Sequence, residues 1–394
     1  MMMEQDLYIL SGARTAIGSF GGQLSSLGPK ELGAHVASAA LERAGVGAEA
    51  VDSLIAGIVL PNEPKDLYVS RRIAKTVGMA DHSTAMNVNR LCGSGVQAIV
   101  SSALDILSGG AQMSLAVGTE SMSNAPYSIP GLRSGRKMSD GTTQDWMLGA
   151  LSCPFGTGHM GVTAENVARE HGISREDQDA FAAESQRRAL RAIEQGLFED
   201  EIAALKLQSR KGDVVVERDE HPRQITEEKL ATLKPVFEKD GTVTAGNASG
   251  INDGAAAVLL ASAEAVQKYG VKPLAKIKGW GIAGVPPHLM GLGPIPAVPK
   301  ALKAAGVSLG EIGVIESNEA FASQAIAVSR ELEFDPAIVN PNGGAIALGH
   351  PVGATGVILT VKALHHMHRN NLDYGLVTMC IGGGQGIALV LEKA

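Results

Sequence analysis

A short internal repeat constrains the fold of this 394-residue chain more than any other feature of its sequence. The segment Leu41-Glu-Arg-Ala-Gly-Val46 has a counterpart in Leu302-Lys-Ala-Ala-Gly-Val307. With the same offset, two apolar positions further on also match: Val51 with Ile312, and Leu54 with Ile315. A helix, a glycine that ends it and a strand thus recur in register, and the strand–helix–strand order after Asn340 resembles that after Asn87. We interpret the chain as two copies of one α/β unit with a doubled sheet.

Strands and helices alternate in the first and last thirds of the chain, which predicts a sheet with helices packed on it. The middle segment, residues 121–245, is richer in proline, glycine and charge, and contains one clear amphipathic helix at 175–195. We interpret it as a large insertion folded over the sheet, because such loops often carry binding residues. Apart from that helix, we expect strands at 7–10, 51–60, 84–88, 115–118, 255–261 and 376–379, and helices at 29–44, 70–77, 96–107 and 263–269.

Composition and charge exclude several classes of protein. Aromatic residues make up only 4% and the net charge is −7, which argues against a nucleic-acid stacking surface and against an anionic membrane as partner. No run of about 18 apolar residues is present, and the apolar run near the N-terminus is too short for a signal peptide. The three cysteines lack CxxC spacing, so they form neither a disulfide framework nor a zinc site. A reducing compartment, by default the cytoplasm, is expected.

Cys92 directly precedes Gly93-Ser-Gly95 and the helix expected at 96–107. At a helix start, unpaired N–H groups and the positive end of the helix dipole favour the reactive thiolate. Taken alone, such a cysteine is more often a small buried residue at a tight turn. The motifs elsewhere in the chain must therefore decide between these two interpretations.

Two polar blocks in the last third are candidates for a site. Residues 316–322 follow an expected strand, and polar residues at strand ends gather at sites in α/β folds, although Ser317 or Asn318 could equally cap a helix. Residues 340–356 surround His350 with glycines and prolines. A histidine on such a rigid turn, entering a helix, is favoured as an acid or a base.

A third block begins with Cys380, at the end of the strand 376–379, and continues with several glycines. Successive glycine N–H groups can point at one developing oxyanion. The block does not fit a dinucleotide fingerprint, because Ile387 takes the place of the third glycine and no helix is expected to follow. A fourth stretch, residues 244–254, is rich in turns and polar residues, and its simplest interpretation is a structural hairpin or capping loop.

Two cysteines and one histidine, each beside glycines at a strand or helix end, suit one kind of reaction. One thiolate takes an acyl group as a thioester, and a second thiol moves a proton on the carbon that becomes the nucleophile. Two other features are interpreted as structural. They are Cys153, which has no obvious base nearby, and the cluster His365, His366 and His368 at a helix end.

Together these motifs resemble the four active-site blocks of the thiolase family, in the family's order. The blocks are Cys92-Gly-Ser-Gly95, Asn318-Glu-Ala-Phe321, Gly349-His-Pro-Val-Gly-Ala-Thr-Gly356 and Cys380-Ile-Gly-Gly-Gly384, and residues 11–18 and 246–250 also fit. The resemblance covers essentially the whole chain. It implies an α/β protein with a five-layered αβαβα fold, built from two similar βαβαβαββ halves with an inserted loop domain. The expected domains are residues 1–120 plus 246–270, the inserted residues 121–245 for CoA binding and tetramerisation, and residues 271–394.

The resemblance also implies a role for each residue of the catalytic blocks. Cys92 would be the acylated nucleophile, and His350 would activate it and help to bind a thioester oxygen. Cys380 would be the acid and base at the α-carbon. Asn318 would hold a water that forms one oxyanion hole with His350, and the N–H groups of Cys92 and Gly382 would form the other.

The substrates implied by the resemblance are acetyl-CoA and acetoacetyl-CoA, with no separate cofactor and no metal. Met160 and Met290 would crowd the acyl pocket and favour acetyl groups. We therefore predict acetyl-CoA C-acetyltransferase activity, a reversible condensation of two acetyl-CoA through an acetyl-Cys92 intermediate. Further substrate contacts are expected along the pantetheine arm, from Leu151, His159, Phe237, Ala245 and Ser249, and from Ala320 and Phe321 of the Asn318 block. Arg223 and Lys229 are expected at the nucleotide end. The alternative for these two cations is that they are solvated charges on loops.

Three other functions remain open at this point. A degradative 3-ketoacyl-CoA thiolase of broader chain length is the nearest, followed by a non-catalytic thiolase-like protein that binds acyl-CoA. A decarboxylating ketosynthase is disfavoured by Cys380, because such enzymes usually pair their cysteine with two histidines or with histidine and asparagine. Family analogy implies a homotetramer, a dimer of dimers, with residues 127–138 as the tetramer-forming loop, and neither nucleic acid nor membrane is expected as a partner.

Overall fold

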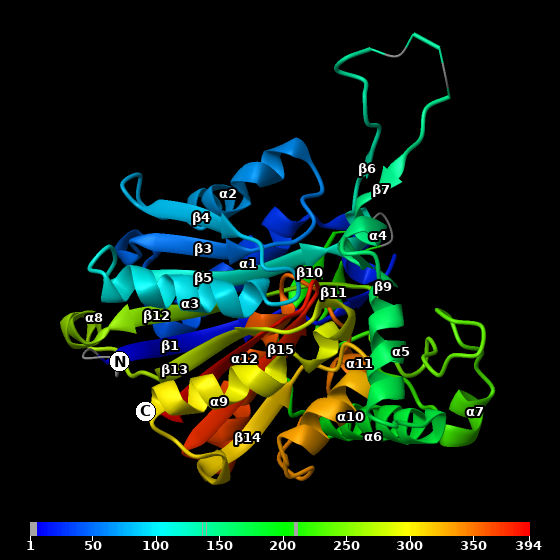
Figure 1. Ribbon diagram of the computed structural model, residues 1–394. Helices are drawn as coiled ribbons and strands as arrows, with labels where there is room; N and C mark the ends of the chain where they lie inside the picture. Colours follow the sequence, from blue (N-terminus) through cyan, green and yellow to red (C-terminus); the bar gives the residue numbers. More distant parts are fainter. Residues whose placement is uncertain (1–5, 136, 139, 209–211) are drawn as a thin grey trace.

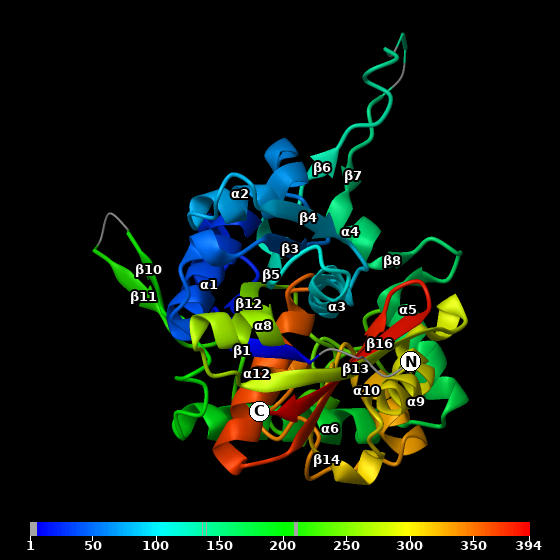
Figure 2. The same cartoon turned by 90° about the vertical axis from the view of Figure 1, so that its left-hand side faces the viewer.

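The computed structural model describes residues 6–135, 137–138, 140–208 and 212–394, so positions 1–5, 136, 139 and 209–211 of the expected domains and loop lie outside the described residues. The described strands form one large mixed sheet of ten strands (Figures 1 and 2). Its members are β1 (Leu7–Arg14), β2 (Gly18–Ser19), β3 (Ser53–Gly57), β4 (Thr84–Val88), β5 (Met113–Ser121), β12 (Asn252–Ser262), β13 (Ala275–Gly284), β14 (Ile312–Ser317), β15 (Tyr374–Ile381) and β16 (Gln385–Lys393).

The sheet consists of two halves with the same strand order. The first half runs β4-β3-β5-β12-β1 and the second β14-β15-β16-β13, with a parallel bridge between Ile315 and Val339 in the place that corresponds to β4. The repeat is confirmed in the helices that precede β3 and β14, namely α1 (Pro29–Ala44) and α9 (Pro294–Ala305). They end at Gly45 and Gly306, with φ of 65° and 69°, a conformation that glycine adopts without strain.

The two halves meet edge to edge. A short antiparallel pairing of β1 with β13 joins Tyr8 to Lys276 and Ile9 to Ala275. The doubled sheet expected from the sequence is thus one continuous sheet, linked by only two residue pairs. No pattern in the sequence marks so short a contact between distant strands.

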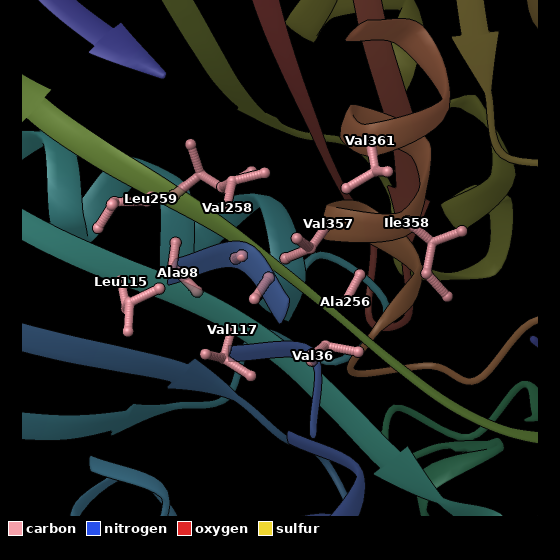
Figure 3. Packing of buried hydrophobic residues seen from close by; sticks show 14 of the residues in the cluster. Val36, Ala98, Leu115, Val117, Ala256, Val258, Leu259, Val357, Ile358 and Val361 are labelled. Carbon is pink, nitrogen blue, oxygen red and sulfur yellow. The ribbon is translucent and has the colours of Figure 1, made fainter. Parts of the chain in front are cut away.

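Helices complete a five-layered arrangement, as expected (Figure 1). The outer face of the first half carries α1 and α2 (Val69–Thr76), and the second half carries α9. Between the two halves lie α3 (Ser94–Leu107) and α12 (Thr355–Asn370). Figure 3 shows Val357, Ile358 and Val361 of α12 beside Ala256 and Val258 of β12, all of them buried.

The two central helices approach each other through glycines near their N-termini. A Cβ on Gly95 would lie 2.7 Å from the backbone nitrogen of Val357, and one on Gly356 would lie 2.3 Å from that of Val96. Any larger residue would push the helices apart. This contact brings the starts of α3 and α12, with the turns that carry Cys92 and His350, to the same point in the molecule.

The middle segment folds over the sheet, as expected. Arg14, fully buried at the end of β1, fixes it through ion pairs with Glu201 and Asp219, at 3.0 and 2.8 Å. One hairpin, β6 with β7, projects far from the body (Figures 1 and 2). The segment contains β6 (Tyr127–Ser128), β7 (Gln144–Asp145), α4 (Trp146–Ala150), β8 (Ser152–Cys153), β9 (Gly158–His159), α5 (Met160–Glu170), α6 (Arg175–Glu194), β10 (Leu205–Leu207), β11 (Val214–Val216) and α7 (Glu227–Ala231). After it, α8 (Ala263–Tyr269) follows β12. From the second half, α10 (Ala322–Glu331) and α11 (Ala345–Leu348) pack against α5 and α6.

Of the six expected strands, only the one at 84–88 has the expected bounds. β5, β12 and β15 extend beyond the expected residues at both ends. β1 continues beyond residue 10 to Arg14, because its last residues pair with β12. The strand expected at 51–60 ends at Gly57, because the N–H groups of Val59 and Leu60 turn away to the carboxylate of Glu120, each at 3.0 Å. None of the described helices is long and apolar enough to cross a membrane.

Candidate active site

A cavity of 380 Å³ lies where the ends of β14 and β15 meet the starts of α3 and α12, under the inserted segment. Its position at the carboxyl ends of strands is typical of ligand sites in α/β folds. The cavity brings together twelve of the predicted site residues: Cys92, Leu151, His159, Met160, Phe237, Ala245, Ser249, Met290, Ala320, Phe321, His350 and Gly382. Residues from both halves and from the insertion therefore converge on one space.

Cys92 follows a sharp turn at the start of α3. Leu91 has a φ of 45°, which is rare for a residue with a branched side chain. Its N–H donates to Asn89 Oδ1 at 2.9 Å, and its carbonyl accepts from Ser94 Oγ at 2.6 Å. Strained turns persist where such bonds determine them, and here the turn presents the thiol to the cavity.

Burial raises the pKa of the Cys92 thiol, while the backbone N–H groups of Gly382 and of Cys92 itself act in the opposite direction. The position of Cys92 at a helix start favoured a thiolate from the sequence alone, but the loss of water outweighs that effect here. The thiol therefore needs a base to become reactive. Two N–H groups that converge on one sulfur also form the kind of nest that stabilises a developing oxyanion.

His350 is buried on the turn that leads into α12. Its own N–H donates to Asn252 Oδ1 at 2.9 Å, which anchors the turn to β12. Nδ1 lies 2.6 Å from the hydroxyl of Thr355, and this hydroxyl donates its only proton to the carbonyl of Pro351 at 2.9 Å. The Thr355 oxygen can therefore only accept from the ring. Hence Nδ1 carries the proton, and Nε2 presents a lone pair.

The environment of His350 suits a base. Burial lowers its pKa to about 4, so the ring is neutral at neutral pH. Asn318 Nδ2 lies 3.4 Å from Nε2, and Asn318 Oδ1 is buried without a partner among the described residues. A lone pair at Nε2 can take a proton, and an unpaired amide oxygen beside it can hold a water.

Cys380 is fully buried near the end of β15 and belongs to an apolar cluster with Met160, Met290 and Phe321. Burial, and then the neighbouring Cys92, raise its pKa well above that of an ordinary thiol. Cys380 and Asn318 do not form part of the cavity wall itself; they lie directly behind it. All three cysteines of the chain are free thiols.

Aromatic rings form part of the wall of the cavity. The rings of His159 and Phe237 stack at 4.7 Å, and Phe237 meets Phe321 edge to face at 6.2 Å. A Cβ on Gly161 would lie 2.2 Å from the Phe237 ring, so this glycine allows the stack. The buried Glu165 holds the following loop by accepting N–H bonds from residues 242 and 243.

The structure does not bring Arg223 and Lys229 into the cavity. Both side chains are exposed, and neither lines the wall. Lys229 lies on α7, whose Leu230 packs against Gly246 at the base of the lining loop. The two cations therefore stand beside the cavity, where only a ligand that extends out of it could meet them.

Several residues with a clear place in the site were not predicted. Thr355 and Asn252 lie in blocks that the motifs marked, but their partners are set by tertiary contacts. Glu120 accepts N–H bonds from Val59, Leu60 and Gly353, and burial raises its pKa to about 8. The available signal was a single acid in an otherwise uncharged strand. Unpredicted lining residues are Val59, Leu91, Met122, Ala150, Val236, Thr244, Ala248, Gly250, Ile251 and Val352. Within the described ranges, no cluster of three or more possible metal ligands occurs.

Comparison with known proteins gives a match over almost the whole chain. The family models "Thiolase, N-terminal domain" and "Thiolase, C-terminal domain" match residues 7–264 and 271–393. The chain is 52% identical to beta-ketothiolase BktB of Cupriavidus necator, over 99% of this chain and 100% of that protein. It is 48% identical to an acetyl-CoA acetyltransferase of Rhizobium meliloti, over 100% of both. Human mitochondrial 3-ketoacyl-CoA thiolase in complex with CoA superimposes with a TM-score of 0.96 at 43% identity, covering 100% of this chain and 99% of that one.

Proposed function

The chain belongs to the thiolase family, and from this we propose that it is an acetyl-CoA C-acetyltransferase, which condenses two acetyl-CoA to acetoacetyl-CoA and CoA. One observation carries the proposal: the Cys92 sulfur faces the Gly382 N–H in a cavity that His350 also lines, with Cys380 directly behind it. The acetyl-CoA acetyltransferase among its relatives and the CoA complex of a structural neighbour support CoA thioesters as substrates. The reaction also runs in reverse, as thiolysis.

In the first half of the proposed reaction, Cys92 takes the acetyl group. Its sulfur attacks the thioester carbonyl carbon, and its proton passes to Nε2 of His350 and then to the departing CoA sulfur. The carbonyl oxygen becomes negative and is held by the N–H groups of Cys92 and Gly382. Whenever Nε2 carries a proton, it binds the oxygen of a CoA thioester on the other side, together with a water on the unpaired Oδ1 of Asn318.

In the second half, Cys380 passes its own proton to Nε2 of His350, which the departing CoA has left free, and the resulting thiolate removes a proton from the methyl carbon of a second acetyl-CoA. The resulting carbanion attacks the carbonyl carbon of acetyl-Cys92, a carbon–carbon bond forms, and Cys92 leaves as a thiolate that takes the proton from Nε2 of His350. The enolate oxygen is held by His350 and the Asn318 water, which makes the α-proton acidic enough to remove. Both thiols are thus needed, but at different steps.

The main rival is a thiolase of broader chain length, which the similarity to a beta-ketothiolase favours. A series of 3-ketoacyl-CoA substrates in the thiolysis direction decides between the two. We expect kcat/KM to be highest for the four-carbon substrate and to fall as the chain lengthens, because Met160 and Met290 occupy the cavity beside the reacting group. An increase in kcat/KM beyond six carbons would establish the broader enzyme instead.

Replacement of Thr355 by valine is expected to lower kcat about 100-fold with little change in the KM for acetyl-CoA. Valine keeps the shape but cannot accept a hydrogen bond from the Nδ1–H group. The ring proton is then free to move to Nε2, where it prevents this nitrogen from accepting the proton of Cys92. In a comparable catalytic triad, forcing the histidine into the wrong tautomer lowers kcat about 10⁴-fold. The loss expected here is smaller, because valine imposes neither tautomer on His350.

The control for this change is Thr355→Ser, which keeps the hydroxyl and should recover most of the activity. The rate of Cys92 alkylation by iodoacetamide should follow the same order, because it reports proton transfer to His350 in the absence of substrate. Equal rates for the valine and serine variants, in both measurements, would show that packing and not the hydroxyl is what matters.

We also propose that four copies assemble through the projecting hairpin and that the enzyme acts in the cytoplasm. The hairpin carries exposed large apolar side chains, among them Tyr127, Leu132 and Met138, which an assembly would cover. Sedimentation equilibrium measures the number of copies directly.

The free state of all three cysteines supports the proposal of a reducing compartment, the cytoplasm.

A further inference from the structure

A second cavity adjoins the catalytic one. It has a volume of 670 Å³ and opens beneath the projecting hairpin, with Trp146 and Leu148 among its lining residues. The two cavities share only three lining residues, which are Val59, Leu91 and Ala150. These three side chains are therefore the partition between the space where the chemistry is proposed to occur and a larger space on the other side.

Leu91 packs in one apolar cluster with Cys92, beside the reacting group. Its Cδ1 lies 3.2 Å from the position that a Cβ on Gly382 would take, and the Cε of Met160 lies 3.4 Å from the same point. Because the Gly382 N–H faces the Cys92 sulfur, these two side chains lie beside the space that an acyl group on that sulfur would enter.

The backbone of Leu91 cannot easily move to admit a longer chain. Its N–H and carbonyl are both bonded within the turn, to Asn89 and to Ser94, and the left-handed conformation depends on these bonds. The extent of the partition is therefore determined by the length of the Leu91 side chain, and not by the flexibility of a loop.

We propose that Leu91 is a specificity-determining residue that closes the catalytic cavity behind the acetyl group and separates it from the second cavity. This inference rests on the proposed function. With a shorter side chain at position 91, straight-chain 3-ketoacyl thioesters of six to eight carbons extend past Val59 into the second cavity. Each methylene that leaves water there raises kcat/KM by about fourfold.

The test is Leu91→Ala, assayed by thiolysis of 3-ketobutyryl-, 3-ketohexanoyl- and 3-ketooctanoyl-CoA. We expect the ratio of kcat/KM for the eight-carbon to the four-carbon substrate to rise at least tenfold over that of the wild type. Leu91→Met, which keeps the volume, should leave the ratio unchanged. Leu148→Ala enlarges only the second cavity, so it should alter the ratio only when it is combined with Leu91→Ala.

Val59→Ala opens the same partition and keeps the hydrogen bonds of the Cys92 turn, because Val59 bonds Glu120 and Asn89 only through its backbone. It decides the question if Leu91→Ala does not fold. An unchanged chain-length ratio in folded Leu91→Ala, or in Val59→Ala where that variant must be used, would overturn the role of Leu91. A wild-type protein without thiolysis on any of the three substrates would instead refute the proposed function, and the inference with it.

Discussion

Cys92→Ala is expected to abolish both condensation and thiolysis, with a fall in kcat of about 10⁴-fold or more, the scale on which loss of a covalent nucleophile acts in other enzymes. The physical reason is that the acyl group has no other acceptor in the cavity. Cys380 is buried behind the wall, and its raised pKa leaves it protonated until substrate arrives. Steady-state rates in both directions measure the loss.

Covalent labelling identifies the nucleophile independently of the rate. Incubation with acetyl-CoA, followed by digestion and mass spectrometry, should find acetate on the peptide that contains Cys92. Cys153→Ala is the matched control, since it removes the one cysteine without a proposed role, and it should keep both the label and the activity. Turnover without a label on Cys92 would contradict the assignment.

The acid limb of activity should lie well below the pKa of an ordinary histidine. Burial lowers the pKa of His350 from 6.5 to about 4, so the ring still accepts a proton from Cys92 at pH 5. Between pH 6.5 and pH 4, His350 binds a proton in the unfolded chain but not in the folded protein. The free energy of unfolding therefore decreases as the pH falls through this range. A kcat/KM profile with its acid limb near 6.5 would show that the ring is not in this environment.

The repeat could be predicted because its signals are local. Gly45 and Gly306 each end a helix in a left-handed conformation, and such a glycine can be recognised from a few neighbouring residues. The joint between β1 and β13 could not be predicted, since a pairing of two residues leaves no pattern in either strand. The extension of β1 to Arg14 was missed because its partner, β12, lies more than two hundred residues away along the chain.

The reactive side chains of the site could be predicted because the chemistry requires unusual sequences around them. Cys92, His350 and Cys380 lie beside glycines that admit close approach of other backbone segments, and this leaves a strong signature. Their supports leave none. Thr355 and Asn252 are ordinary helix and strand residues until the fold places them against His350. The roles of Arg223 and Lys229 stay predictions, since the fold leaves both side chains exposed beside the cavity, where the nucleotide end of a ligand would have to reach them.

Cys380→Ala should separate the two halves of the reaction. The variant keeps Cys92, His350 and both N–H groups of the proposed acyl oxyanion hole, so acetyl transfer to Cys92 should proceed within about tenfold of the wild-type rate. Condensation needs a base at the α-carbon and should fall about 10³-fold or more, which is within the range that positioned acid–base groups contribute. Single-turnover release of CoA from one equivalent of acetyl-CoA measures the first step, and acetoacetyl-CoA formation measures both.

Hydrogen exchange at the substrate methyl group provides the sharpest measurement of this role. In heavy water, the wild type should wash deuterium into the methyl carbon of an acetyl thioester bound to the acetylated enzyme, because Cys380 removes and returns that proton. Cys380→Ala should abolish the exchange and still show a full acetate label on Cys92, whereas Cys380→Ser should retain a trace of exchange, since a hydroxyl is a much weaker acid than a thiol. If Cys380→Ala condenses at the wild-type rate, another group removes the proton, and the high pKa of the buried Cys380 thiol would then reflect only its apolar surroundings.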